Sequence, residues 1–208
     1  MWHMIEKPWQ ACFEMGWLSF KNGSVPIGSV IVNDKGSIIA KGRNMIFDDK
    51  GENGQIMRHK LAHAEMNALL KANQFEYPDI RKFCLYTTTE PCPLCFGALV
   101  MANIRHVKFA SRDGLAGSTD LNEKSNYISS KNINIEGPYP VMEKVQIAIQ
   151  TVFELTKSAN PDRVLRIFKN DNPEAVECGI KLFEDGTLKI MMEKDLPASE
   201  VFDIISSM

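Results

Sequence analysis

Two cysteines three residues apart constrain this chain more than any other feature of its sequence. Cys92 and Cys95 lie in the segment PCPLC at residues 91–95. Pro91 stands just before the pair, and proline is common where a helix begins. Helical residues three apart share a face, so both sulfur atoms can point at one place. The pair is a redox couple, half of a metal site, or two buried small side chains.

The other cysteines do not decide between these interpretations. The chain of 208 residues has five of them, Cys12, Cys84, Cys92, Cys95 and Cys178. An odd number, scattered over a chain of this length, is not typical of a disulfide framework.

The N-terminal segment has charged residues among its apolar ones and no signal-peptide core. No apolar run reaches the roughly 20 residues of a membrane span. We therefore expect a cytoplasmic protein that does not contact a membrane.

The overall charge gives no sign of a polyanionic partner. The chain is 44% hydrophobic and 24% charged, with a formal net charge of −2, as in an ordinary globular protein. A local basic patch would not show in this total, so a nucleic-acid substrate stays possible.

Strands and helices alternate along the first three quarters of the chain. Apolar spacing and turn residues predict helices over 8–20, 61–73, 92–102 and 142–157, and strands over 27–33, 37–43, 83–88, 104–110 and 132–137. Residues 114–126 are predicted to be a loop. This alternation favours a sheet with helices on both faces.

A histidine and a glutamate upstream complete a possible metal site. His63 and Glu65 lie in the segment HAEMNALL, and His63 precedes Cys92 by 29 residues. Zinc binds imidazole nitrogen and thiolate sulfur, and a catalytic zinc keeps one position open to water. His63 and Glu65 are two residues apart, which places them on opposite sides of an ideal helix. Both can serve one site only in a first helical turn, so spacing alone leaves the question open.

The two segments HAE and PCPLC resemble the H-x-E…P-C-x-x-C signature of the cytidine deaminase superfamily of zinc-dependent hydrolases. The resemblance covers roughly residues 5–157 and includes GRN at 42–44 and LAGST at 115–119. It implies that His63, Cys92 and Cys95 bind Zn²⁺ and that Glu65 moves protons. Together with the order of the elements, it predicts an α/β protein, a three-layer α/β/α sandwich with a mixed sheet of about five strands.

The resemblance also implies a reaction, the hydrolytic deamination of a nucleobase or nucleoside. Two thiolates and a neutral histidine leave a Zn²⁺ site formally neutral, so its water is less acidic than beside three histidines. A neighbouring carboxylate, here Glu65, would compensate. Ammonia then leaves from the ring carbon that bore the amino group.

A purely structural zinc is the main competing interpretation. Such a site needs a fourth protein ligand, for which only Cys84 or His59 would be close enough. A structural site has no use for Glu65, so its presence favours an enzyme. A thioredoxin-like redox pair would follow a first strand and lack a partner histidine.

The substrate is less constrained than the reaction. Asn44 matches the asparagine that binds the base or its sugar in the superfamily; without that resemblance it would be a turn residue at the end of a strand. Glu90, in TEPCP, is similar to the purine-acting branches, whereas LYTT and HAEMNAL echo pyrimidine enzymes. The acidic segment FDDKGEN at 47–53 and the negative net charge favour a small molecule over tRNA. We expect a purine-type base or nucleoside. A tRNA adenosine deaminase and a cytosine or deoxycytidylate deaminase are the alternatives.

The composition changes after about residue 158. Asn-Pro pairs interrupt the chain at 160–161 and 172–173, and Asn172 before Pro173 is typical of a helix N-cap. A last short helix is predicted over 197–207. We expect a deaminase-like catalytic domain over 1–157 and an accessory extension over 158–208 that caps the pocket or extends an oligomer interface. The superfamily commonly forms oligomers, so we also expect a homodimer.

Overall fold

The sheet of this protein has five strands in a mixed arrangement. A computed structural model describes residues 1–51 and 54–208. The strand order is β2-β1-β3-β4-β5. The strands are β1 (Gly28–Val32), β2 (Ile38–Arg43), β3 (Cys84–Thr89), β4 (His106–Ser111) and β5 (Asn134–Glu136). β1 runs antiparallel to β2 and to β3, whereas β3, β4 and β5 are parallel. The predicted mixed sheet is confirmed.

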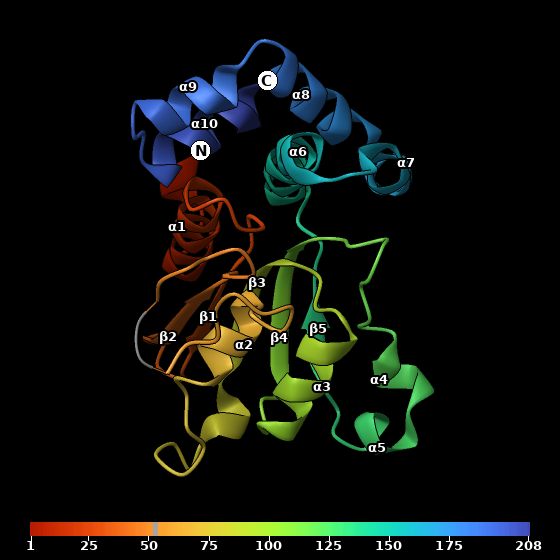
Figure 1. The fold of residues 1–208 in the computed structure, drawn as a ribbon. Helices are drawn as coiled ribbons and strands as arrows, with labels where there is room; N and C mark the ends of the chain where they lie inside the picture. The colour runs from red at the N-terminus through yellow and green to blue at the C-terminus, as the bar shows by residue number, and fades with distance from the viewer. Residues whose placement is uncertain (52–53) are drawn as a thin grey trace.

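Helices cover both faces of this sheet, as Figure 1 shows. On one side lie α1 (Lys7–Lys21) and α6 (Pro140–Lys157), and on the other lie α2 (Ala64–Leu69) and α3 (Pro93–Met101). Val30 and Val32 of β1 belong to the core with α1 and α6, whereas Ile31 packs with α2 and α3. This alternation follows from the two-residue period of a strand. The three-layer α/β/α sandwich is confirmed.

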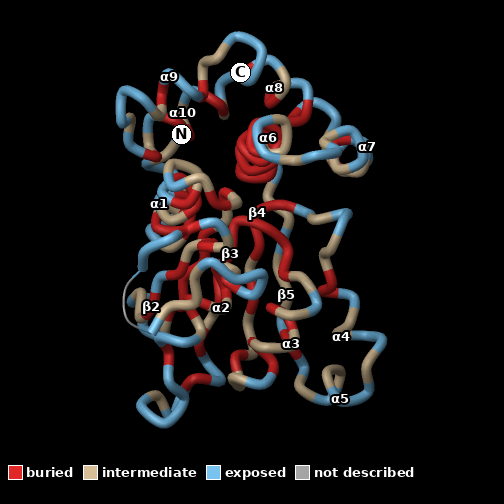
Figure 2. The backbone as a smooth tube through the Cα atoms, viewed as in Figure 1, coloured by how far each residue is buried: buried red, intermediate tan, exposed pale blue. Residues whose placement is uncertain are grey.

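The C-terminal residues form four helices that lie over α1 and α6, away from the sheet (Figure 1). They are α7 (Pro161–Asp171), α8 (Pro173–Glu184), α9 (Thr187–Glu193) and α10 (Ala198–Ser207). Leu182, Leu188 and Val201 of these helices share one apolar core with Trp17 and Val152. Figure 2 shows that α6, enclosed between the sheet and these helices, is buried along most of its length. The division of the chain at residue 157 stays a prediction.

The N-terminus is bound to the last helix. The Met1 amino group lies 2.8 Å from the Asp203 carboxylate, which also accepts a hydrogen bond of 2.6 Å from the Trp2 amide. The Trp2 ring meets Phe202 edge-to-face at 5.6 Å. The two ends of the chain are therefore held together.

Asparagine caps begin two of the C-terminal helices. Asn172 Oδ1 accepts a hydrogen bond of 3.0 Å from the Ala175 amide, which confirms the predicted N-cap. Asn160 accepts in the same way from the Arg163 amide at 3.4 Å. A proline follows each asparagine at the first helical position, where its missing N–H costs nothing.

Two segments predicted from the sequence differ from the structure. The helix expected over 61–73 extends only from Ala64 to Leu69, with turns on both sides. The loop expected over 114–126 ends in α4 (Leu121–Lys124), and α5 (Asn126–Ser129) follows it. Both are single turns, too short to give an apolar periodicity. Two 3₁₀ turns, Trp2–Met4 and Ile80–Lys82, were also not expected. In the described part of the chain, no helix has the length and apolar character to cross a bilayer.

β2 and α2 touch at Gly42, and this close contact generates a prediction. A Cβ atom on Gly42 would lie 2.2 Å from the Ala64 carbonyl oxygen and 2.4 Å from the Ala68 nitrogen. Gly42→Ala should therefore push α2 from the sheet and lower the free energy of unfolding by about 2 kcal/mol, measured by urea titration.

Gly97 inside α3 is the matched control, since a Cβ there meets no heavy atom within 4 Å apart from its chain neighbours and the backbone of its own helix. Gly97→Ala should raise the free energy of unfolding by roughly 0.5 kcal/mol through helix propensity. Equal effects at the two glycines would contradict the close contact.

Candidate metal centre and active site

Three of the predicted site residues meet at one end of β3. The Nδ1 atom of His63 lies 3.5 Å from Cys92 Sγ and 3.4 Å from Cys95 Sγ. Within the described residues, these three side chains form a group whose ligand atoms all lie within 4.8 Å of one another. One nitrogen and two sulfurs are the donor types that zinc prefers. The residues present therefore fit this metal.

Two helix N-termini bring the three side chains together. His63 is the N-cap of α2, and Cys92 is the N-cap of α3. Both have extended backbone, with ψ of 155° and 172°, so neither side chain follows the helical spacing. Glu65 lies in the first turn of α2. This explains how His63 and Glu65, although two residues apart, face the same site.

The two thiols differ in acidity because they share a hydrogen bond. A hydrogen bond from the Cys95 side chain lowers the pKa of Cys92 to about 4, and a hydrogen bond with His63 acts in the same direction. The same bond and burial raise the pKa of Cys95. The bond to Cys92 also raises the pKa of His63. A thiolate is thus already favoured at Cys92, the form in which cysteine binds a metal.

Glu65 is a buried carboxylate beside these ligands. It is only 4% exposed, and its Oε2 lies 3.3 Å from Cys95 Sγ. Thr87 of β3 donates to Oε1 at 3.2 Å. Burial raises the pKa of Glu65 above its ordinary value. A carboxyl group in such a place is suited to take up and return a proton.

Asn44 directly follows β2 and is 2% exposed. Its Oδ1 accepts a hydrogen bond of 3.1 Å from the Ile46 amide, as in an Asx turn. The next residue, Met45, donates its amide to Ala62 at 2.8 Å, so this segment runs beside His63. Among the described residues, Nδ2 of Asn44 has no hydrogen-bond partner. Asn44 is thus a turn residue with a free donor.

Glu90 holds a loop rather than facing the ligand group. Its Oε1 accepts hydrogen bonds from the amide and hydroxyl of Thr119, and its Oε2 accepts from the Asp113 amide at 3.4 Å. A Cβ on Gly117 would lie 2.4 Å from the same oxygen. The small residues of LAGST therefore let the loop close around the carboxylate. Asp113 caps the turn itself, accepting from the Leu115 and Ala116 amides at 3.0 Å each.

Three polar side chains form a stripe along α6 and hydrogen-bond to three segments at the ends of the strands. Glu143 accepts from the Arg112 amide at 3.0 Å, and Gln146 donates to the Pro26 carbonyl at 2.9 Å. Gln150 accepts from the Thr89 hydroxyl at 3.4 Å. Sequence reasoning missed this stripe, because glutamate and glutamine at helical spacing are typical of a solvent-facing side. It also missed Thr87, although a run of three threonines in a buried strand was a signal.

Neither candidate for a fourth protein ligand belongs to the metal group. His59 is exposed, and its Nδ1 accepts from the Leu61 amide at 3.1 Å. Cys84 begins β3, whereas Cys92 follows the end of that strand. Burial raises the pKa of Cys84 to about 12. Within the described residues, the group thus has three donors, as the catalytic pattern requires.

A family model for the cytidine and deoxycytidylate deaminase zinc-binding region matches residues 4–111. The chain belongs to this family. The matched span includes the three candidate ligands and Glu65, and the cofactor of the family is zinc.

Curated relatives cover different activities. A tRNA-specific adenosine deaminase of Aquifex aeolicus is 35% identical over 96 residues, which is 46% of this chain and 58% of that protein. A cytosine deaminase of Candida albicans is 26% identical over 117 residues, 56% of this chain and 72% of that protein. A tRNA(Ile)-lysidine synthase of Deinococcus radiodurans is 35% identical over 95 residues, 45% of this chain but only 15% of that enzyme.

Solved structures share the fold. One from a study of tRNA:A34 deaminases has a TM-score of 0.51 at 23% identity, covering 62% of this chain and 96% of that one. Guanine deaminase from Nitrosomonas europaea has a TM-score of 0.50 at 19% identity, covering 73% of this chain and 86% of that one. At these identities the likeness shows the fold alone.

The buried position of Glu90 predicts a local effect of its removal. Glu90→Ala leaves the Thr119 and Asp113 amides without their acceptor, so it should lower the free energy of unfolding by about 2 kcal/mol. Amide hydrogen exchange should accelerate across residues 113–119. Glu123→Ala, an exposed glutamate just beyond this loop, is the control and should change neither quantity. Unchanged exchange at residues 113–119 in Glu90→Ala would show that Glu90 does not hold the loop.

Proposed function

We propose that this protein is a zinc-dependent hydrolytic deaminase of a nucleobase or nucleoside. His63, Cys92 and Cys95 hold the metal, and Glu65 is the catalytic acid and base. The observation that carries this proposal is the buried Glu65 carboxylate, 3.3 Å from one of the three converging donors. A structural metal site gains nothing from a carboxylate in this place.

The roles of the side chains follow from their positions. When bound, the metal supplies an acidified water as the nucleophile. Glu65 would accept one proton of the attacking water and deliver it to the ring nitrogen beside the carbon under attack. A second proton passes through Glu65 to the departing amine. Water is thus consumed and ammonia released. Thr87 holds Oε1 of Glu65, which leaves Oε2 directed at the metal ligands.

The free Nδ2 donor of Asn44 supports its role in substrate binding. Its Oδ1 is held by the Ile46 amide, so the orientation of the amide group is set before a substrate arrives. An acceptor on a base or a sugar is the matching group. The preference for a purine rests on the likeness of TEPCP to purine-acting enzymes. Glu90 itself is occupied by the loop over 113–119, so its effect on the substrate is indirect.

Two other substrate classes have specific support. The likeness to a tRNA-specific adenosine deaminase supports a tRNA substrate, and the likeness to a cytosine deaminase supports a pyrimidine. The low total charge favours a small molecule. Part of the acidic segment over 47–53 lies outside the described residues, so its effect on the choice of substrate stays a prediction. A cytoplasmic location is also a prediction.

A homodimer is proposed as the working form. Leu70, Phe75 and Met101, which lie at or beyond the C-terminal ends of α2 and α3, are 52%, 88% and 66% exposed. Large apolar side chains exposed in this way are typical of an interface. Sedimentation of the zinc-loaded protein tests this proposal, and a monomer at micromolar concentration would contradict it.

Variants separate metal binding from turnover. Cys92→Ala should lose zinc, because two donors remain, whereas Glu65→Gln should keep one zinc per chain and lose turnover by about a thousandfold or more. Zinc is measured by elemental analysis, and turnover as ammonia release. Cys178→Ala, in the C-terminal helices, is the control and should keep both. Loss of zinc in Glu65→Gln would contradict the role of Glu65 as a catalytic acid and base that does not bind the metal.

A substrate panel tests the class of substrate. We expect the zinc-loaded protein to release ammonia from guanine, adenine or a purine nucleoside, and less readily from cytosine compounds. Release from cytosine compounds alone would favour the pyrimidine alternative. Activity restricted to structured RNA would favour the tRNA alternative.

A further inference from the structure

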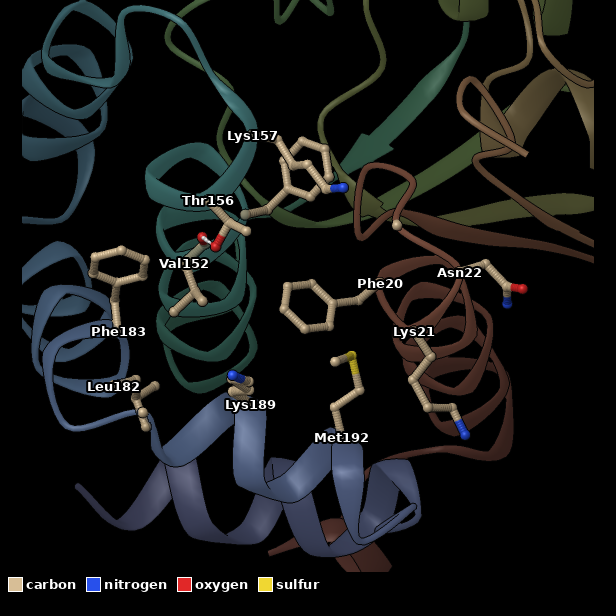
Figure 3. Close-up of a pocket in the computed structure, with 13 residues that line it drawn as sticks. Phe20, Lys21, Asn22, Val152, Thr156, Lys157, Leu182, Phe183, Lys189 and Met192 are labelled. Atoms are coloured by element: carbon tan, nitrogen blue, oxygen red, sulfur yellow. Dashed lines mark hydrogen bonds between the residues drawn. The ribbon is translucent and has the colours of Figure 1, made fainter. Parts of the chain in front are cut away.

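A cavity of about 610 Å³ lies where α1, α6, α8 and α9 meet. Figure 3 shows the ring of Phe20 and the side chain of Met192 extending into it from α1 and α9. Its apolar lining consists of Phe20, Val152, Phe153, Leu182, Phe183 and Met192. None of the candidate ligands, Glu65 or Asn44 lines it. The cavity therefore lies apart from the candidate metal centre, between the catalytic core and the C-terminal helices.

Its charged lining residues are all positive. Lys21, Lys157 and Lys189 line the cavity, and no acidic side chain among the described residues does so. Lys21 lies 2.6 Å from Asp195, and Lys189 lies 3.8 Å from Glu193. The side-chain ammonium group of Lys157 has no hydrogen-bond or ion-pair partner within the described residues. Figure 3 shows its ammonium group on the α1 side of the opening, toward the end of that helix. Among the described residues that line the cavity, Lys157 therefore supplies the one ammonium group without an ion-pair partner.

The size and lining define the ligand. Cavities of a few hundred cubic ångströms with apolar walls and a few polar groups are typical of small-molecule sites. We propose that this cavity is a second ligand site, for a small molecule with an apolar body and one carboxylate. The body lies against Phe20 and Met192, and the carboxylate meets Lys157.

Trp17 provides a signal for occupancy. Its ring stacks on Phe20 at 5.3 Å with an interplanar angle of 9°. Its Nε1 donates a hydrogen bond of 2.8 Å to the Leu196 carbonyl, so the ring is held in place. A ligand against Phe20 changes the surroundings of Trp17, and its fluorescence should follow. Trp9, packed on Tyr86 and Tyr139 in the core, does not line the cavity.

The cavity also borders the segment that carries Asn44. Phe153 in its wall meets Phe47 at 6.4 Å, three residues after Asn44. The Phe47 amide donates to Ser24 Oγ at 3.0 Å, next to Gly23 in the lining. The wall of the cavity therefore contacts the segment that follows Asn44. The test must separate the two sites, and it uses binding rather than activity.

The probes are octanoate and octanol, titrated into the zinc-loaded full chain and followed by calorimetry and tryptophan fluorescence. Octanoate should bind and change the fluorescence. Lys157→Met should weaken octanoate roughly threefold, as expected for an ion pair at an exposed rim, and leave octanol unchanged. Lys194→Met, on an exposed lysine of the same region outside the cavity, should match the parent protein.

A second variant fills the cavity instead of changing its charge. Thr156→Phe places a ring in the lining near the end of α6 and should abolish octanoate binding while the zinc content stays the same. Failure of octanoate to bind would overturn the proposal. Equal losses for octanoate and octanol in Lys157→Met, or release of zinc by octanoate, would overturn it as well. Because none of these readouts uses turnover, they stand whether or not the deaminase proposal fails.

Discussion

The meeting of two helix N-termini at the end of β3 is the constraint on which this site depends. His63 and Cys92 both stand at N-cap positions with extended backbone, so each side chain turns back toward the strand end. Such a position also places the partial positive charge of a helix near a thiolate or a carboxylate. The absence of a side chain at Gly42 lets α2 lie close enough to the sheet for this to occur, beside Ala64 and Ala68.

α6 joins this site to the rest of the molecule. One side of the helix presents Glu143, Gln146 and Gln150 to segments at the ends of the strands. Another side packs against α7 and α8 through Ile147. Buried polar groups with satisfied hydrogen bonds hold one arrangement of their neighbours in preference to others. The C-terminal helices thus pack against α6, and α6 in turn binds the segments at the ends of the strands. These helices contribute none of the candidate ligands.

Much of the architecture could be predicted from the sequence, because the hairpin, the buried strand and the amphipathic helices are local patterns. That His63, Cys92 and Cys95 lie together could be predicted because HAE and PCPLC combine residue types that few other sites need. The role of Glu90 could not, since its partners Thr119 and Asp113 come from a loop more than twenty residues away. The polar stripe of α6 and the cavity beside α9 also depend on contacts distant in the sequence. Periodicity alone cannot tell a buried polar face from an exposed one.

X-ray absorption at the zinc edge of the zinc-loaded protein tests the central claim most directly. If His63, Cys92 and Cys95 hold the metal and one position stays open to water, the spectrum will show two sulfur neighbours at about 2.3 Å and two lighter ones at about 2.0 Å. Three or four sulfur neighbours, or none, would mean that other residues bind the metal. The catalytic interpretation of Glu65 would then fail with the ligand set.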